Sequence, residues 1–485
     1  MKRMLCILLL LVTVACVPTP EVEYVVNKSD GVLEQRLYAS PVPTASIPAE
    51  AATDSPHTSD TAVTPEPTAE PIVFPTHWND TIDVTDQLQI TIDAPVVTRA
   101  DGVYPVYRTR ARSFTPSEIL AILSALMPKP VQRLSGARTK DEVAEQIKRF
   151  NEEAARWQQW RANGRPIGEQ PDGEELTDEY IAEVLAEYAE QLQNAPARDT
   201  AQPVTDFDPT LDHAVYELEN GKRASVLLAD QWISFSIGGA ENMFYTQAEY
   251  ERDLTQPDNP ENNAKNWQPV TISEEAATET LRAAMDRIGF DGFAIAYTQC
   301  ANLIKGNGQS VASGWLFTLT RDYGGYPLEP QAKADGRIQY AEGDGYAANR
   351  PVPKETVKFL ITEDGIAYFS VDGAKQVVGI VNENVALLPF DEIRERALNA
   401  LRYSFSGYGG GNYTSSFTVF KAVLTVYTLR IRNEEDYYEM PCWLLLFDHT
   451  LASGDYMRDG THIRQYRALV INAVDGSIVN PNVGY

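Results

Sequence analysis

Residues 270–290, VTISEEAATETLRAAMDRIGF, combine a helix start, an amphipathic body and a helix stop in one short stretch. Ser273, placed before two glutamates, is a typical N-cap, and Gly289 is a typical residue at the end of a helix. The two runs that follow, FAIAYTQCANL at 293–303 and GWLFTLTRD at 314–322, are strand-like. The stretch therefore predicts a helix that packs beside antiparallel strands.

The same theme recurs on both sides of this stretch. A helix is predicted at 115–127, where Thr115 and Glu118 form a capping box and Pro116 suits the first turn. Another is predicted at 389–405. Strands and hairpins are expected around these helices at 87–97, 103–112, 214–228, 357–373, 417–432, 441–448 and 468–479. We therefore expect an α+β fold made of repeated helix-plus-antiparallel-sheet subdomains, without the strict period of a solenoid or propeller.

Asn-Gly and Asp-Gly pairs mark the expected tight turns, because both positions accept the positive φ that such turns require. Asn220-Gly221 and Asp101-Gly102 each stand between two strand-like runs and predict hairpins. Asp475-Gly476 has the same form near the end of the chain. Asp475 is therefore interpreted as a turn residue rather than a catalyst.

The N-terminus has the pattern of a secretory signal. Lys2 and Arg3 precede an apolar run that is too short for a bilayer-spanning helix, and the small residue Ala15 precedes Cys16. This pattern resembles a bacterial lipoprotein signal, although Thr13 stands where that signal usually has a larger aliphatic residue. It implies that Cys16 is lipidated and that the protein is anchored on the extracytoplasmic face of the cell membrane. The alternative is an ordinary cleaved signal with a chance cysteine.

Composition divides the chain into consecutive regions. After the signal peptide at 1–15, residues 16–75 are rich in Pro, Thr and Ala and predict a disordered tether. For the rest of the chain, the sequence predicts an N-terminal α+β domain at 76–240, a middle module at 241–350 and a C-terminal module at 351–485. The first of these carries two helices that look inserted, at 139–164 and 176–193, and we interpret the acidic face of the second as a solvated surface.

Two of the four cysteines could be either thiols or partners in a disulfide. Cys6 belongs to the signal and Cys16 to the anchor, so Cys300 and Cys442 remain. They are expected to be buried thiols in apolar strands, with a disulfide between them as the alternative. No zinc-binding spacing occurs, and we expect neither a metal nor a cofactor.

The formal charge of −27 and the pI near 4.6 argue against binding to nucleic acid or to anionic lipid head groups, since both require basic surfaces. Motifs for a nucleophile elbow, a zinc protease, a phosphate-binding loop and a dinucleotide fold are absent from the sequence.

The stretch 321–351 is the one region that suggests a ligand contact. It reads as a long loop with Tyr323, Tyr326, Tyr340 and Tyr346, and exposed aromatic rings on a loop can stack on sugars or grip a peptide. The alternative, which we favour, is that these tyrosines pack the loop against its own sheet.

The helix TISEEAATETLRAAM and the ending INAVDGSIV resemble the PepSY type of module, in which a capped helix packs on strands that end in a hairpin. ITEDGIAYFSVDG, ENVALLPFDEIRERAL and MPCWLLLFD are similar to the envelope proteins YycH and YycI. The resemblance implies PepSY-like and YycI-like modules in the middle and C-terminal regions. It also implies regulation of an envelope protein through protein contacts, and it provides no catalytic residues.

The leading functional prediction is therefore a non-enzymatic, lipid-anchored protein that binds or regulates an envelope protein. A second hypothesis is a module that binds cell-wall glycan or peptide through the tyrosine-rich loop. A third is an uncharacterised hydrolase, which would need converging carboxylates that a sequence alone does not reveal.

Overall fold

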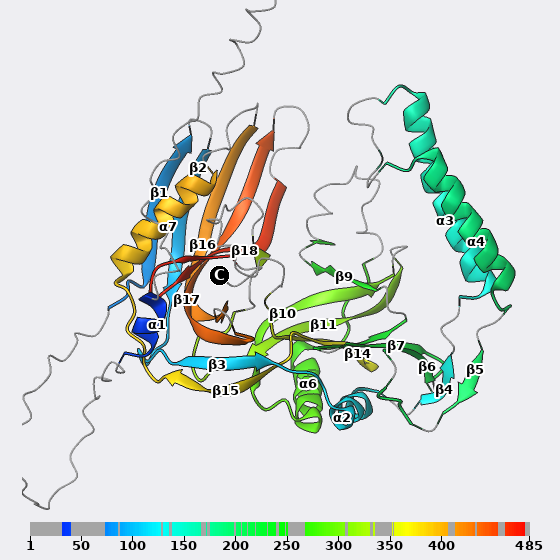
Figure 1. The fold of residues 1–485 in the computed structure, drawn as a ribbon, viewed down its shortest axis with the longest axis horizontal. Helices are drawn as coiled ribbons and strands as arrows, with labels where there is room; N and C mark the ends of the chain where they lie inside the picture. The colour runs from blue at the N-terminus through cyan, green and yellow to red at the C-terminus, as the bar shows by residue number, and fades with distance from the viewer. Residues whose placement is uncertain are drawn as a thin grey trace, which may run out of the picture.

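The computed structural model of the chain is built around two large β-sheets. It describes residues 32–39 and most of the chain from 73 to 480, and the longest gaps in the described part are 251–266, 335–351, 406–412 and 454–460. The fold is mixed α+β, as the sequence predicts. Figure 1 shows one sheet standing upright and the other lying below and beside it.

The upright sheet, here called sheet A, draws its strands from both ends of the chain. Its main path runs in the order β1-β2-β16-β17-β18-β12, and β3, β15 and β19 pair off this path. The strands are β1 (His77–Thr85), β2 (Leu88–Val97), β3 (Val106–Ala111), β12 (Lys333–Ala334), β15 (Lys375–Asn382), β16 (Tyr413–Arg430), β17 (Asp436–Ser453), β18 (Thr461–Asn472) and β19 (Ile478–Val479). Most pairs are antiparallel, but β16 runs parallel to β2.

The second sheet, sheet B, has the order β5-β4-β6-β7-β8-β14-β13-β11-β10-β9. Its strands are β4 (Pro130–Leu134), β5 (Ala201–Pro203), β6 (His213–Leu218), β7 (Arg223–Ala229), β8 (Trp232–Ile237), β9 (Met243–Thr246), β10 (Phe293–Ile304), β11 (Ser310–Arg321), β13 (Thr356–Thr362) and β14 (Gly365–Asp372). All of its described pairs are antiparallel.

The sheets do not follow the predicted consecutive domains. The boundary at 240/241 and the one at 350/351 both lie between β8 and β14, which pair directly, with Phe235 opposite Phe369. In the same way, Ile92 of β2 lies opposite Val419 of β16. Each sheet is therefore completed by strands from distant parts of the chain, and three separate modules in a row do not describe it.

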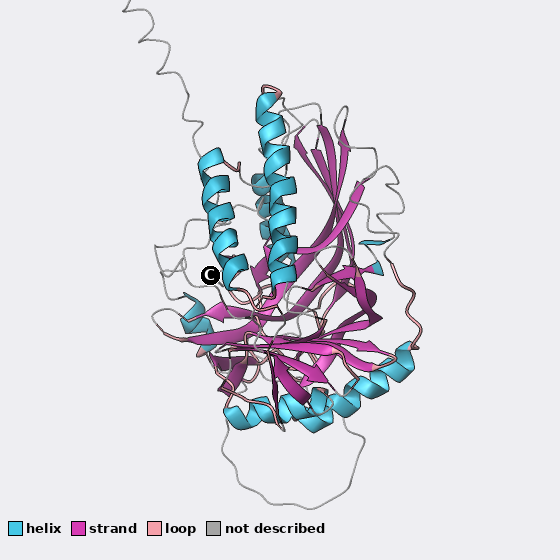
Figure 2. Ribbon diagram, turned by 90° about the vertical axis from the view of Figure 1, so that its right-hand side faces the viewer, coloured by secondary structure: helices cyan, strands magenta, loops and turns pink. Residues whose placement is uncertain are grey.

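Helices cover one face of each sheet, and their caps are those that the sequence predicts. α2 (Pro116–Leu126) and α6 (Glu274–Ile288) lie on one face of sheet B, and α7 (Phe390–Phe405) lies on sheet A (Figures 1 and 2). The capping box of Thr115 and Glu118 is formed, Ser273 caps α6, and Gly289 ends it with φ of +81°. None of the described helices is both long and apolar enough to cross a bilayer.

Two further helices form an arm. α3 (Lys140–Ala162) and α4 (Asp178–Asn194) stand side by side (Figures 1 and 2), and Figure 1 shows them standing apart from the sheets. They bury only a few apolar side chains between them: Val143, Ala154, Trp157 and Ile181. The inserted pair of helices that the sequence predicts is thus confirmed as a helical hairpin.

The turn predictions have mixed outcomes. Gly221 and Gly476 adopt positive φ in hairpins, as expected, and Asp475 Oδ1 accepts a hydrogen bond from the Ser477 backbone N–H at 2.8 Å. The hairpin predicted at Asp101-Gly102 is wrong, although the turn is present. The strands on its two sides pair elsewhere, β2 with β1 and β16, and β3 with β15 and β17.

The predicted tether is interrupted by a docked helix, α1 (Val32–Leu37). Leu37 is fully buried in the core of sheet A, and Arg36 Nη1 donates to the Val474 carbonyl at 2.5 Å. Asn382 Nδ2, at the end of β15, donates to the carbonyls of Leu37 and Ala39 at 2.9 and 3.2 Å. The prediction of a continuous disordered tether over 16–75 is therefore wrong at 32–39, because this short apolar turn is part of the folded body.

Candidate functional site

The polar centre of the molecule lies where the chain crosses between the two sheets. One crossing leads from β3 to α2, one follows β11, and one joins β14 to β15. The last crossing needs Gly373, whose φ is +64° and whose added Cβ would lie 2.8 Å from the Lys354 backbone nitrogen. At these crossings, backbone from both sheets comes close together, and charged side chains fill the space.

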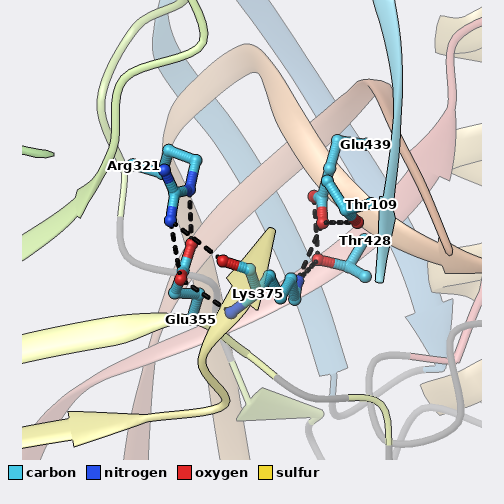
Figure 3. A network of polar contacts seen from close by, with 6 residues as sticks. All are labelled: Thr109, Arg321, Glu355, Lys375, Thr428 and Glu439. Carbon is cyan, nitrogen blue, oxygen red and sulfur yellow. Dashed lines mark hydrogen bonds and ion pairs between the residues drawn. The ribbon is translucent and has the colours of Figure 1, made fainter. Parts of the chain in front are cut away.

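A buried lysine and a buried glutamate form the heart of this junction (Figure 3). Lys375 begins β15 and Glu439 lies on β17, and their side chains are 1% and 0% exposed. Lys375 Nζ lies 2.8 Å from Glu439 Oε1 and donates to Thr428 Oγ1 at 2.6 Å. Thr109 and Thr428 donate to the two Glu439 oxygens at 3.0 and 2.9 Å. The ammonium and carboxylate thus neutralise one another, and hydroxyls complete the carboxylate's hydrogen bonds.

A second ion pair joins this cluster from the side of sheet B. Arg321, at the end of β11, binds Glu355 in a bidentate manner, from Nε at 2.6 Å and from Nη2 at 2.9 Å. Glu355 Oε1 also accepts the backbone N–H of Lys375 at 2.9 Å. Burial disfavours the charge of the guanidinium, but the hydrogen bond and charge of Glu355 outweigh it, so the pKa of Arg321 is raised. Lys375 therefore contacts both carboxylates, one through its backbone and one through its side chain.

A third carboxylate fixes β3 to β17. Asp436 is 2% exposed and receives Arg110 Nε at 2.5 Å and Arg108 Nε at 2.6 Å. The hydrogen bond from Arg110 is the largest influence on this carboxyl. Together with the one from Arg108 it outweighs burial and lowers the pKa of Asp436.

Two small pockets flank the Arg321–Glu355 pair, which lines both of them. The first has a cavity volume of about 30 Å³, and Tyr323 and Tyr326 are among the residues that line it. The second has a volume of about 160 Å³ and lies under α2 and α6, beside Phe293. Both are smaller than the roughly 300–1,000 Å³ typical of small-molecule sites. The described part of the chain contains no group of His, Cys, Asp and Glu side chains placed to hold a metal ion.

The tyrosines proposed as ligand contacts are core residues where the structure describes them. Tyr323 and Tyr326 are 9% and 4% exposed, and burial raises the pKa of both phenols well above the ordinary value. Tyr326 donates to the Pro105 carbonyl at 2.9 Å, and its ring lies 4.8 Å from the Arg99 guanidinium carbon. Their exposure as stacking platforms is contradicted. Both rings are buried, as the packing alternative expects, but they lie in the core of sheet A rather than against sheet B, whose strand β11 leads into the loop. Tyr340 and Tyr346 lie outside the described residues.

The start of the predicted loop is fastened to sheet A by further polar contacts. Thr425 Oγ1 donates to the Pro327 carbonyl at 2.5 Å, and Lys421 forms an ion pair with Glu329. Burial lowers the pKa of Lys421. The segment from Tyr323 to Glu329 is thus part of the packed junction rather than a free recognition loop.

Cys300 and Cys442 do not form a disulfide. Cys442 is fully buried in β17 of sheet A, and Cys300 is half-buried in β10 of sheet B, where burial raises its pKa. The alternative of a disulfide between them is not realised, because they stand on different sheets. Cys16 lies outside the described residues.

Reasoning from the sequence missed the junction entirely. The sequence does contain an indication of a buried ion pair. Glu439 interrupts the apolar run from Tyr437 to Phe447, and a charge inside a buried strand needs a partner. The identity of that partner was not readable, since Lys375 is 64 residues away along the chain.

Comparison with known proteins gives little context for this arrangement. No family model matches the chain, and no curated protein matches it. A solved structure of an uncharacterised protein from Eubacterium rectale ATCC 33656 is similar at 11% identity with a TM-score of 0.40, covering 83% of this chain and 93% of that one.

Proposed function

We propose that this protein is a lipid-anchored component of the cell envelope that acts on the extracytoplasmic face of the membrane through contacts with another envelope protein, without catalysis. The observation that carries the proposal is the saturation of the junction. Lys375, Glu439, Arg321 and Glu355 bind one another or neighbouring hydroxyl and backbone groups, so their charges hold the two sheets together. A general acid or base, by contrast, needs a proton-accepting or proton-donating group directed at substrate.

The finer architecture belongs to the same proposal. α6 is followed by β10 and β11, and α7 by β16, β17 and β18, so each helix precedes antiparallel strands of one sheet. This order supports a derivation of both units from PepSY-like or YycI-like modules. The signal pattern that ends in Cys16 supports the anchor and the extracytoplasmic location, and the formal charge of −27 supports a partner other than nucleic acid.

The arm formed by α3 and α4 is where we expect the partner to bind. It stands clear of both sheets, and Tyr180 on α4 leaves 49% of its surface exposed. Tyrosine combines a large apolar ring with a polar tip, which suits a protein interface.

A photoreactive amino acid at position 180 of the full-length protein in living cells tests this proposal. We expect one discrete crosslinked product that mass spectrometry identifies as an envelope protein, and we expect it to disappear in the Cys16→Ala variant. The matched control carries the photoreactive group at Val73, which is 84% exposed but lies away from the arm's helices. Equal products at both positions, or none at 180, would argue against a partner at the arm.

A further inference from the structure

The edge strand β15 is the most unusual surface of the protein. It pairs with β3 on one side, and among the described residues no strand covers its other side, as Figure 1 shows. Val377, Val378 and Ile380 are 45%, 49% and 57% exposed, so large aliphatic side chains are exposed at neighbouring positions. An apolar edge with open backbone groups is a template for pairing with another strand.

Other edges of the two sheets carry protection that β15 lacks. β1, at the end of the main path of sheet A, places the exposed carboxylate of Asp83 on its surface. β5 has three residues and includes Pro203, and β9 has four residues. Charge, proline, short length and β-bulges are the usual means of blocking edge pairing. Residues 376–381 of β15, with the sequence QVVGIV, contain neither charge nor proline, and the interruptions in the strand are two shifts in its register with β3, at Val377/Gly379 and Ile380/Asn382.

The docked helix α1 limits how far this edge can lie from the membrane. Asn382, which ends β15, binds the carbonyls of Leu37 and Ala39 directly after α1. If Cys16 carries the lipid, residues 17–31 are the only chain between the membrane and the docked helix, and they span at most about 50 Å when fully extended. A continuous tether to residue 75 would have allowed about 200 Å. In every anchored copy, α1 and the end of β15 beside it therefore stay within about 50 Å of the membrane.

We propose that β15 pairs with β15 of a second copy of this chain on the membrane, about a two-fold axis. This inference rests on the lipid anchor of the proposed function. A two-fold interface brings the same patch of both copies together, and an uncharged aliphatic strand is complementary to itself. Because residues 376–381 carry no charge, the two strands meet without like-charge contact despite the chain's net charge of −27.

The membrane is required for this pairing. A single strand pair buries less than the roughly 1,600 Å² of a standard stable interface. Confinement by the anchor raises the effective concentration of one edge for the other, in the same way as a short linker does. The unlipidated protein is accordingly a monomer at micromolar concentration, and the anchored protein forms pairs.

The test is thiol crosslinking of the full-length, lipidated Val378→Cys variant in its membrane with a short bifunctional maleimide. The matched control is Met243→Cys, because Met243 is 55% exposed on the edge strand β9 of sheet B. The wild-type protein gives the background from Cys300 and Cys442. We expect at least ten times more covalent homodimer from position 378 than from position 243, and a further Ile380→Lys substitution should reduce that yield at least ten-fold.

Several results overturn the inference. These are no homodimer at position 378, equal yields at both positions, no effect of Ile380→Lys, or a crosslink from 378 to a different protein. Membrane fractionation of the same samples reports the anchor separately. If the wild-type protein is absent from the membrane fraction, the lipid-anchor proposal fails. If it is present there and position 378 gives no homodimer, the pairing of β15 fails while the anchor proposal stands.

Discussion

Replacing Lys375 by methionine removes the ammonium group that lies against Glu439 Oε1. The substitution keeps an unbranched side chain but leaves a carboxylate that is 0% exposed with hydroxyl partners alone. Breaking a buried pair by removing one partner costs about 3–5 kcal/mol, because the remaining charge is buried without compensation. Native domains are stable by only about 5–15 kcal/mol, so Lys375→Met should remove a large part of the free energy of unfolding.

Urea unfolding followed by tryptophan fluorescence measures this loss, since Trp443 is fully buried in β17, the strand that carries Glu439. The matched control is Lys222→Met. Lys222 Nζ lies 2.7 Å from Asp364, a distance like that in the buried pair, but the two side chains are 42% and 74% exposed. An exposed pair contributes about 0–1 kcal/mol, so this control should unfold close to the wild-type urea concentration.

A second substitution separates charge burial from lost packing. Adding Glu439→Gln to Lys375→Met removes the orphaned charge. The amide oxygen can still accept from one of Thr109 and Thr428, and the hydroxyl of the other can turn to accept from the amide NH2. The double variant should therefore be more stable than Lys375→Met alone. The reasoning is refuted if Lys375→Met lies within about 1 kcal/mol of the wild type, the range of an exposed pair. It is also refuted if the second substitution lowers stability further.

Three more outcomes are expected. In urea unfolding, Gly373→Ala should destabilise the protein more than Gly102→Ala. Both glycines have positive φ, so alanine at either position costs about 1–2 kcal/mol of backbone strain. Only at Gly373 would the new Cβ also collide with backbone atoms. Leu37→Ala should accelerate amide hydrogen exchange at 32–39 with little change in the global unfolding midpoint, because α1 can detach alone; unchanged exchange there would contradict its docking role. Asp436→Asn should destabilise the protein at neutral pH. Since the hydrogen bond from Arg110 lowers the pKa of Asp436, the wild-type advantage should vanish only as the pH falls below 4 through that lowered value.

Local features of the fold were predictable because they depend on neighbouring residues. The capping box at Thr115, the N-cap at Ser273 and the turn at Asn220-Gly221 are each set by a few adjacent side chains, and all are present. The Asp101-Gly102 turn shows the limit of this reasoning. The turn forms, yet pairing of the strands beside it is decided by contacts with distant strands such as β16 and β15.

The arrangement of the sheets was not predictable for the same reason. An alternating or apolar run shows that a strand is buried, but it does not show which strand lies beside it. Nothing near Phe235 indicates that its partner across the sheet is Phe369. The docking of α1 was hidden by its length, because a six-residue helix buries too few residues to give a clear pattern in a segment rich in Pro, Thr and Ala.

The junction ties the strand register of sheet A to the position of sheet B. Thr428 and Glu439 lie directly opposite one another on β16 and β17, and a slip of one residue in either strand would turn one of them to the other face of the sheet. Lys375 binds Glu439 with its side chain and Glu355 with its backbone, so the register of sheet A is tied to the position of sheet B. A buried ion pair adds little net stability compared with apolar packing, but an unpaired charge is costly, so the cluster penalises every misaligned arrangement. It thereby fixes sheet B relative to α1 and β15 on sheet A.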